Sequence, residues 1–154
     1  MIKPFSLQPL MNLAQSQNDS ATRNLGKLNK QQQNAQEKLE ALHQYRRDYQ
    51  TRLQESTQNG MDPAELRNFQ EFINKLDAAI NQQQKVVEQS RLSTQVGRGE
   101  FDTTRRKLKS FDTLQQRHIV EQKKVTEKSE QKALDEHTGR FTAQKMIKAE
   151  NPNT

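Results

Sequence analysis

The chain has 154 residues, a length that suits one ordinary globular domain. Only 30% of its residues are hydrophobic, 29% are charged and none is tryptophan, which excludes a compact core of normal size. The formal net charge is +6, and cysteine is absent, which excludes disulfides, thiolate metal sites and a cysteine nucleophile. Two classes of structure remain: a disordered chain, or long helices that bury one narrow stripe against each other.

The N-terminal residues lack the features of a secretion signal. Met1 to Ser6 leads into polar residues without an apolar run, and no stretch approaches the roughly 20 apolar residues of a membrane helix. We therefore expect a soluble protein.

A hydrophobic stripe repeats at alternating steps of four and three residues between Leu7 and Leu53. All but three of its positions are apolar, which is typical of a coiled-coil seam. The exceptions, Asn18, Gln32 and Arg46, share one heptad position, where polar residues usually fix register at a cost in stability. The stripe consists of Leu7, Met11, Ala14, Asn18, Ala21, Leu25, Leu28, Gln32, Ala35, Leu39, Leu42, Arg46, Tyr49 and Leu53.

A polar turn over residues 56–61 separates this stripe from a second one. Asp62 followed by Pro63 marks a helix start, with an N-cap carboxylate and proline at the first helical position. The second stripe weakens towards Gly97 and Gly99, where a kink or a frayed turn is expected because each glycine costs about 1 kcal/mol in a helix. The apolar positions of this stripe are Leu66, Phe69, Ile73, Leu76, Ile80, Val87, Phe101, Leu108 and Phe111, with Gln83 between Ile80 and Val87.

A turn this short makes the two helices antiparallel. With the turn centred near residue 59, Tyr49 faces Phe69, Tyr45 neighbours Phe72, and Phe101 lies beside Asn18. The predicted fold is all-α: a long antiparallel two-helix coiled coil, or α-hairpin, with an overhanging C-terminal helix. Its predicted parts are helix 1 over about 7–55, the turn, helix 2 over about 63–138, together one domain over 1–139, and a disordered tail over 140–154.

The sequence contains no pattern typical of catalysis. Phosphate-loop, zinc-protease and Gly-x-Ser-x-Gly motifs are absent. His43, His118 and His137 are too widely separated to share a metal, and the carboxylates alternate with Lys, Arg and Gln as on solvated helix faces. We expect no enzyme activity, no catalytic residue, no cofactor and no bound metal.

The basic run from Arg105 to Lys109 and a sequence pI near 9.7 raise the question of nucleic-acid binding. Acidic residues are mixed into the same region, and no recognised reading module is present. A solvated face, or a site for an acidic protein partner, is the favoured interpretation. A basic coiled coil that binds nucleic acid stays open as an alternative.

Beside the seam, Tyr45, Phe72 and Ala79 occupy positions that the pairing of two helices leaves partly exposed. An aromatic patch of this kind is typical of a surface that docks a partner. The alternative is that the rings only fold over the edge of the seam.

The run Leu39-x-x-Leu42-x-x-Tyr45-x-x-x-Tyr49, followed after the turn by Phe69-Gln70-x-Phe72-Ile73-x-x-Leu76-x-x-Ala79-Ile80, resembles the FliJ proteins of the bacterial flagellar type III export apparatus. The length, the glutamine richness and the basic C-terminal helix agree with this resemblance, whose distinctive part is residues 39–80. Lys38 and Gln83 depart from the family pattern, and the Gly97-x-Gly99 pair is foreign to it.

The resemblance implies a non-enzymatic stalk that inserts into the hexameric export ATPase ring, contacts the membrane export gate and hands over export chaperones. It also implies a cytoplasmic location, peripheral at the inner membrane through these partners, and no nucleic-acid ligand. The gate-binding residues would be Leu42, Tyr45, Tyr49, Phe72, Leu76 and Ala79. The ATPase-ring contacts would be Arg105, Arg106, Lys107, Lys109, Lys123 and Lys124. The related stalk of a virulence-type secretion system is the alternative with the same mechanics.

Overall fold

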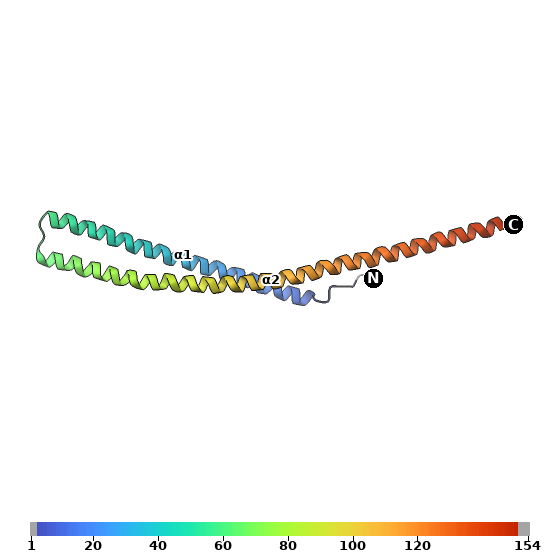
Figure 1. The fold of residues 1–154 in the computed structure, drawn as a ribbon, viewed down its shortest axis with the longest axis horizontal. Coiled ribbons are helices and arrows are strands. Elements are labelled where there is room, and N and C mark those ends of the chain that lie inside the picture. The colour runs from blue at the N-terminus through green and yellow to red at the C-terminus, as the bar shows by residue number, and fades with distance from the viewer. Residues whose placement is uncertain (1–2, 151–154) are drawn as a thin grey trace. The chain divides into compact units, whose positions relative to one another are not determined.

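The computed structural model describes residues 3–150, which form two helices and the segments around them. Helix α1 spans Gln8–Gln58 and helix α2 spans Pro63–Glu150, and the two pack against each other. Figure 1 shows α1 and α2 joined by the short connection at one end of the hairpin. The predicted all-α hairpin is confirmed.

The connection between the helices comprises residues 59–62 and depends on one glycine. Gly60 has a φ of 86°, a left-handed conformation that costs glycine nothing but strains other residues. Its N–H donates to the carbonyl of Thr57, and the N–H of Asn59 donates to the carbonyl of Glu55, so two of the last four carbonyls of α1 are satisfied. At the start of α2 the Asp62 carbonyl accepts from the N–H of Leu66, as an N-cap residue does.

Contacts divide the chain into two compact units. Unit 1 comprises Met1–Gln15 with Arg106–Thr154, and unit 2 comprises Ser16–Arg105. The single domain over 1–139 stays a prediction. Each unit pairs a piece of α1 with a piece of α2.

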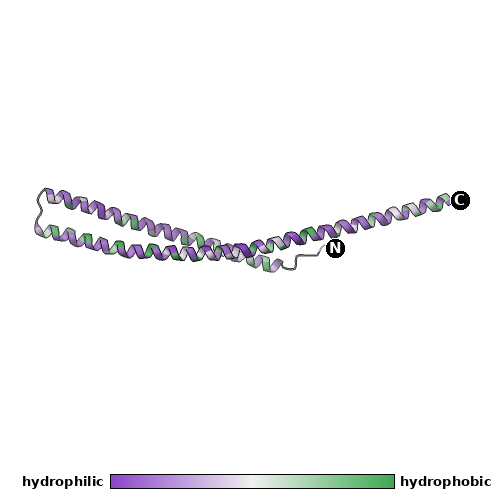
Figure 2. Cartoon of the chain, viewed as in Figure 1, coloured by the Kyte–Doolittle hydropathy of each residue, from purple (hydrophilic) through white to green (hydrophobic). Residues whose placement is uncertain are grey.

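The predicted stripe of α1 is the face that α1 packs against α2. All 14 of its positions are buried or half-buried, and so are the predicted seam positions of α2 apart from Leu66. Hydrophobic residues are sparse among hydrophilic ones on both helices (Figure 2), so the core is only as wide as this stripe. The most buried apolar residues are Ala14, Ala35, Leu76 and Ile80.

At several places along unit 2, polar side chains of the seam make contacts across it. The Nε2 of buried Gln83 donates to the carbonyl of Ala35 at 2.9 Å. The Thr94 hydroxyl lies 3.3 Å from the carbonyl oxygen of Leu28, and its shorter bond, at 2.8 Å, goes to the Ser90 carbonyl of its own helix. The Nδ2 of Asn18 donates to the Oγ1 of Thr104 at 3.2 Å. Because these bonds require one alignment of the helices, they fix the register.

The register differs from the prediction by a few residues. Asn18 meets Thr104 instead of Phe101, three residues further along α2. The reason lies in the connection: Ser56 and Thr57 stay helical, with the Thr57 hydroxyl bonded to the carbonyl of Leu53, so α1 ends at Gln58 and not near residue 55.

α2 continues without interruption through Gly97 and Gly99, where a kink or frayed turn was expected. Gly97 is buried against α1, and a Cβ at this position would lie 2.5 Å from Leu28 Cδ1. The glycine is therefore the place where the two helices of unit 2 approach closely.

The C-terminal boundary also differs from the prediction. α2 ends at Glu150 and not near residue 138, so residues 140–150 are helical where a disordered tail was predicted. One glycine, Gly139, does not stop the helix, because most of residues 143–150 after it are good helix formers. Residues 151–154 of that predicted tail lie outside the described part of the chain.

The overhang of the C-terminal helix is present in unit 1. The half-buried positions of α2 end at Gln122, and every residue from 123 to 150 is exposed. Within residues 3–150, this last part of α2 has no tertiary packing partner. The covered part extends further than expected because the segment before α1 also lies on α2, through Lys3 and Phe5.

Candidate functional site

The six residues expected to bind the gate all lie in unit 2, but they differ in exposure. Tyr45 is 65% exposed and Phe72 is 42% exposed, so both rings offer surface to a partner. Leu42, Tyr49 and Ala79 are half-buried. Leu76 is buried in the seam and cannot touch a partner while the helices stay paired.

The Tyr49 ring lies close to two other aromatic rings of unit 2. Its ring centroid lies 4.9 Å from that of Phe69 and 4.3 Å from that of Phe72, with interplanar angles of 47° and 40°. Tilted ring pairs at this distance stabilise by about 0.5–1.5 kcal/mol beyond their buried area. The Tyr49–Phe69 pair is the predicted one.

The neighbour of Phe72 is Tyr49, and not Tyr45 as the predicted register implied. Tyr45 lies one helical turn before Tyr49 on α1, and Ala79 lies two turns after Phe72 on α2. These four residues therefore follow one flank of the seam, which we call the aromatic flank: Tyr45, Tyr49, Phe72 and Ala79.

The opposite flank of the seam carries charge. The Nε of Arg46 donates to Oδ1 of Asp77 at 2.6 Å. Asp77 follows Phe72 by five residues, or about 140° around the helix, so the ion pair and the aromatic flank lie on different sides. Hydrogen bonding to Asp77, reinforced by its negative charge, raises the pKa of the Arg46 guanidinium.

Two other classes of site receive no support within residues 3–150. Groups of three or more His, Asp or Glu side chains placed to hold a metal ion do not occur there. In the same residues, neither helix contains a stretch apolar and long enough to cross a membrane.

Comparison with known proteins gives the family. The family model described as "Flagellar FliJ protein" matches residues 3–146, nearly the whole chain. The chain belongs to the FliJ family. It is similar to the "Flagellar FliJ protein" of Salmonella typhi, with 28% identity over 145 residues that cover 94% of this chain and 99% of that protein. The protein of the same name from Escherichia coli (strain K12) is 26% identical over the same shares. The resemblance noted on residues 39–80 is confirmed, and the FliJ family makes the chain a component of the flagellar export apparatus.

The two departures from the FliJ pattern have different places in the structure. Lys38 is exposed on α1, whereas Gln83 is buried in the seam with its amide bonded to the Ala35 carbonyl. Gln83 therefore holds the register of the hairpin and cannot contact a partner directly.

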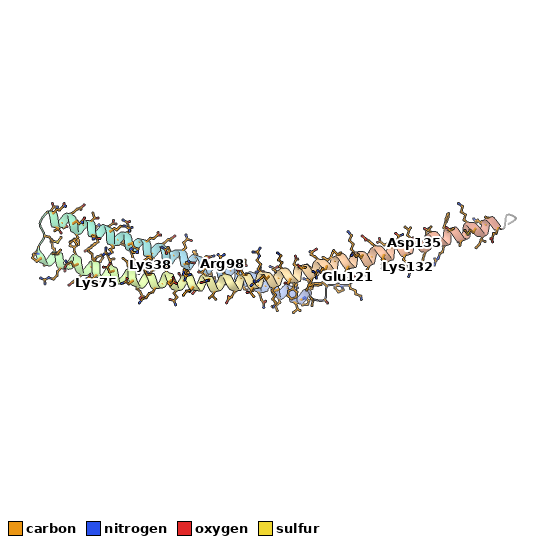
Figure 3. All side chains as sticks on the ribbon, viewed as in Figure 1. Lys38, Lys75, Arg98, Glu121, Lys132 and Asp135 are labelled. Atoms are coloured by element: carbon orange, nitrogen blue, oxygen red, sulfur yellow. The ribbon has the colours of Figure 1, made fainter. Side chains whose placement is uncertain are left out.

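The six cations expected at the ATPase ring are exposed on α2, with Arg105 in unit 2 and the other five in unit 1. In the described part of the chain, none of them forms an ion pair with a carboxylate. Successive helical residues point about 100° apart, so these six cations cover roughly 200° of the helix circumference, on the side away from the seam, and form one broad face. Charged side chains such as Lys75, Glu121 and Lys132 likewise project along α2 (Figure 3).

Proposed function

We propose that the chain is a non-enzymatic stalk of the flagellar type III export apparatus. It links the export ATPase ring to the export gate and assists the handover of chaperones and their substrates. The observation that carries this proposal is the aromatic flank, which exposes Tyr45 and Phe72 beside an otherwise polar surface. Family membership and the flagellar names of the relatives support the flagellar machinery over a virulence-type system.

The aromatic flank suits the gate because two of its rings are exposed and one of these, Phe72, is also held in place. Tyr49 supports Phe72 from inside the seam, so Phe72 loses little conformational freedom when a partner covers it. Aromatic residues held in this way are frequent among the side chains that dominate binding energy. Leu76 and Leu42 contribute by holding the helices together beneath the rings.

The unpaired cations on the C-terminal part of α2 support the ATPase ring as the second partner. Lys123 and Lys124 begin the part of α2 that lacks packing, so acidic groups of a partner can reach them directly. Acidic residues such as Glu121 and Glu127 lie among these cations, which disfavours a nucleic-acid duplex as the ligand.

Replacing the two exposed rings tests the gate contact. We expect the variant Tyr45→Ala with Phe72→Ala to bind the cytoplasmic part of the export gate on the order of 1000-fold more weakly, because each buried aromatic anchor contributes about 2 kcal/mol and the two losses add to about 4 kcal/mol. Binding is measured by titration calorimetry, and motility of cells that carry the variant should fall in parallel.

Leu92→Ala is the matched control, since Leu92 is 49% exposed on α2 and away from the aromatic flank. It should bind the gate like the wild type, and the double variant should retain its helicity and its binding to the ATPase ring. Wild-type gate affinity in a helical double variant would refute the assignment of the aromatic flank.

A further inference from the structure

The segment before α1 is held on α2 by its main chain. The N–H of Lys3 donates to Oε1 of Gln122 at 3.1 Å, and the carbonyl of Lys3 lies 2.8 Å from Nε2 of His118. A carbonyl oxygen only accepts, so Nε2 of His118 carries the proton of this bond. His118 and Gln122 are one turn apart on the same face of α2 and together bind both main-chain groups of one residue.

Two further contacts complete this attachment. The Phe5 ring lies 5.6 Å from the His118 ring at an angle of 47°, and Nε2 of Gln115 donates to Oε1 of Gln8 at 3.0 Å. Around them is a groove of about 590 Å³, to which Pro4, Phe5 and Ile119 contribute apolar surface. The groove lies entirely within unit 1.

The residue types on α2 fit an extended ligand better than a helical one. Gln115, His118 and Gln122 continue the heptad positions of the seam, and there His118 and Gln122 face a segment that is not helical. The main-chain N–H groups inside a helix are already bonded within the helix, so only an extended segment can bond α2 through both its N–H and its C=O, as Lys3 does. Polar side chains at seam positions can bond an extended main chain whatever its sequence, while the aromatic contact adds selectivity.

We propose that His118 and Gln122, next to Gln115, which bonds Gln8 at the start of α1, form a clamp for extended peptides, which the chain's own residues 3–5 occupy until a partner segment replaces them. The partner segment is extended and has an aromatic residue two positions after the residue that the clamp holds, as Phe5 follows Lys3. Once residues 3–5 leave, Lys123 is the one full charge lining the groove, so a carboxylate in the partner segment is favoured. Occupation by the chain's own segment makes the clamp autoinhibited.

The test uses the full-length chain with its own segment disabled. Lys3→Pro removes the N–H that Gln122 binds, and Phe5→Ala removes the ring, so this double variant has a vacant clamp. The probe is a fluorescent peptide of the first eight residues, followed by anisotropy. We expect it to bind the double variant at least about tenfold more tightly than the wild type, whose tethered segment competes at high effective concentration.

Changes in the peptide report on selectivity. A peptide with Phe5→Ala should bind about tenfold more weakly, and one with Lys3→Glu should bind several-fold more tightly because of Lys123. Adding His118→Ala and Gln122→Ala to the vacant-clamp chain should abolish binding. Gln131→Ala with His137→Ala, the same residue types at exposed positions on α2, is the matched control and should leave binding unchanged.

A second measurement keeps the test decisive if peptide binding is weak. The chain lacks cysteine, so the variant Ser6→Cys with Thr126→Cys carries nitroxide labels at these two positions and nowhere else. The distribution of distances between the two labels is measured by pulsed electron paramagnetic resonance. We expect a narrow distribution that broadens with His118→Ala and Gln122→Ala. An equally broad distance distribution in the chain that keeps His118 and Gln122 would overturn the proposal. Equal peptide binding to the wild type and to the Lys3→Pro with Phe5→Ala variant would also overturn it, as would an equal loss of peptide binding in the Gln131→Ala with His137→Ala control. None of these outcomes depends on the gate or on the ATPase ring.

Discussion

Ile80→Ala is expected to destabilise the hairpin by about 2–3 kcal/mol, because truncating a buried isoleucine removes burial and leaves a cavity. Ile80 is 6% exposed at the centre of a seam only one stripe wide, so no second layer can collapse into the gap. For a chain of this length, the melting temperature followed by circular dichroism should fall by about 5–10 °C.

Val96→Ala is the matched control for this truncation. Val96 is also β-branched and lies on α2, but it is 64% exposed. Its replacement should change the free energy of unfolding by less than about 0.5 kcal/mol. Equal melting temperatures for the two variants would mean that the seam does not hold unit 2 together.

Gly97→Leu is expected to destabilise the hairpin by about 2 kcal/mol, because overpacking a close contact forces side chains or backbone to move. A Cβ at Gly97 already meets Leu28 Cδ1 at 2.5 Å, and leucine places three more carbons beyond it. Urea unfolding should show a lower midpoint with an unchanged slope if the fold is kept.

Two alanine variants separate packing from helix propensity. At Gly99 an added Cβ meets nothing within 4 Å, so Gly99→Ala should stabilise the chain by up to about 1 kcal/mol through propensity alone. Gly97→Ala should have a smaller net effect, because rotation of the flexible Leu28 side chain offsets the same gain. Stabilisation by Gly97→Leu equal to that of Gly99→Ala would contradict the close approach at Gly97.

The heptad pattern was enough to predict the fold and the buried face. Apolar residues at steps of four and three leave little choice of which side of a helix is buried, and this held even at Asn18, Gln32 and Arg46. The exposure of Tyr45 and Phe72 followed from the same geometry, since both lie beside the stripe.

The register and the ends needed the structure. Ser56 and Thr57 are compatible with both turn and helix, so the sequence placed the turn too early and paired Phe72 with Tyr45. The attachment of Lys3 to His118 and Gln122 has no local sequence signal, because it joins a main chain to side chains more than 100 residues away. Burial of Leu76 also removes one residue from the predicted gate surface.

The central claim is that α1 and α2 of one molecule pair antiparallel in the register set by Asn18 and Thr104. The chain has no cysteine, so two cysteine pairs can be introduced and oxidised at low protein concentration: Asn18→Cys with Thr104→Cys, and Asn18→Cys with Phe101→Cys. Closure of each disulfide is followed by the electrophoretic mobility of the denatured chain. We expect the first pair to close rapidly into an intramolecular disulfide and the second to close much more slowly. Faster closure of the second pair, or disulfides only between molecules, would contradict the hairpin described here.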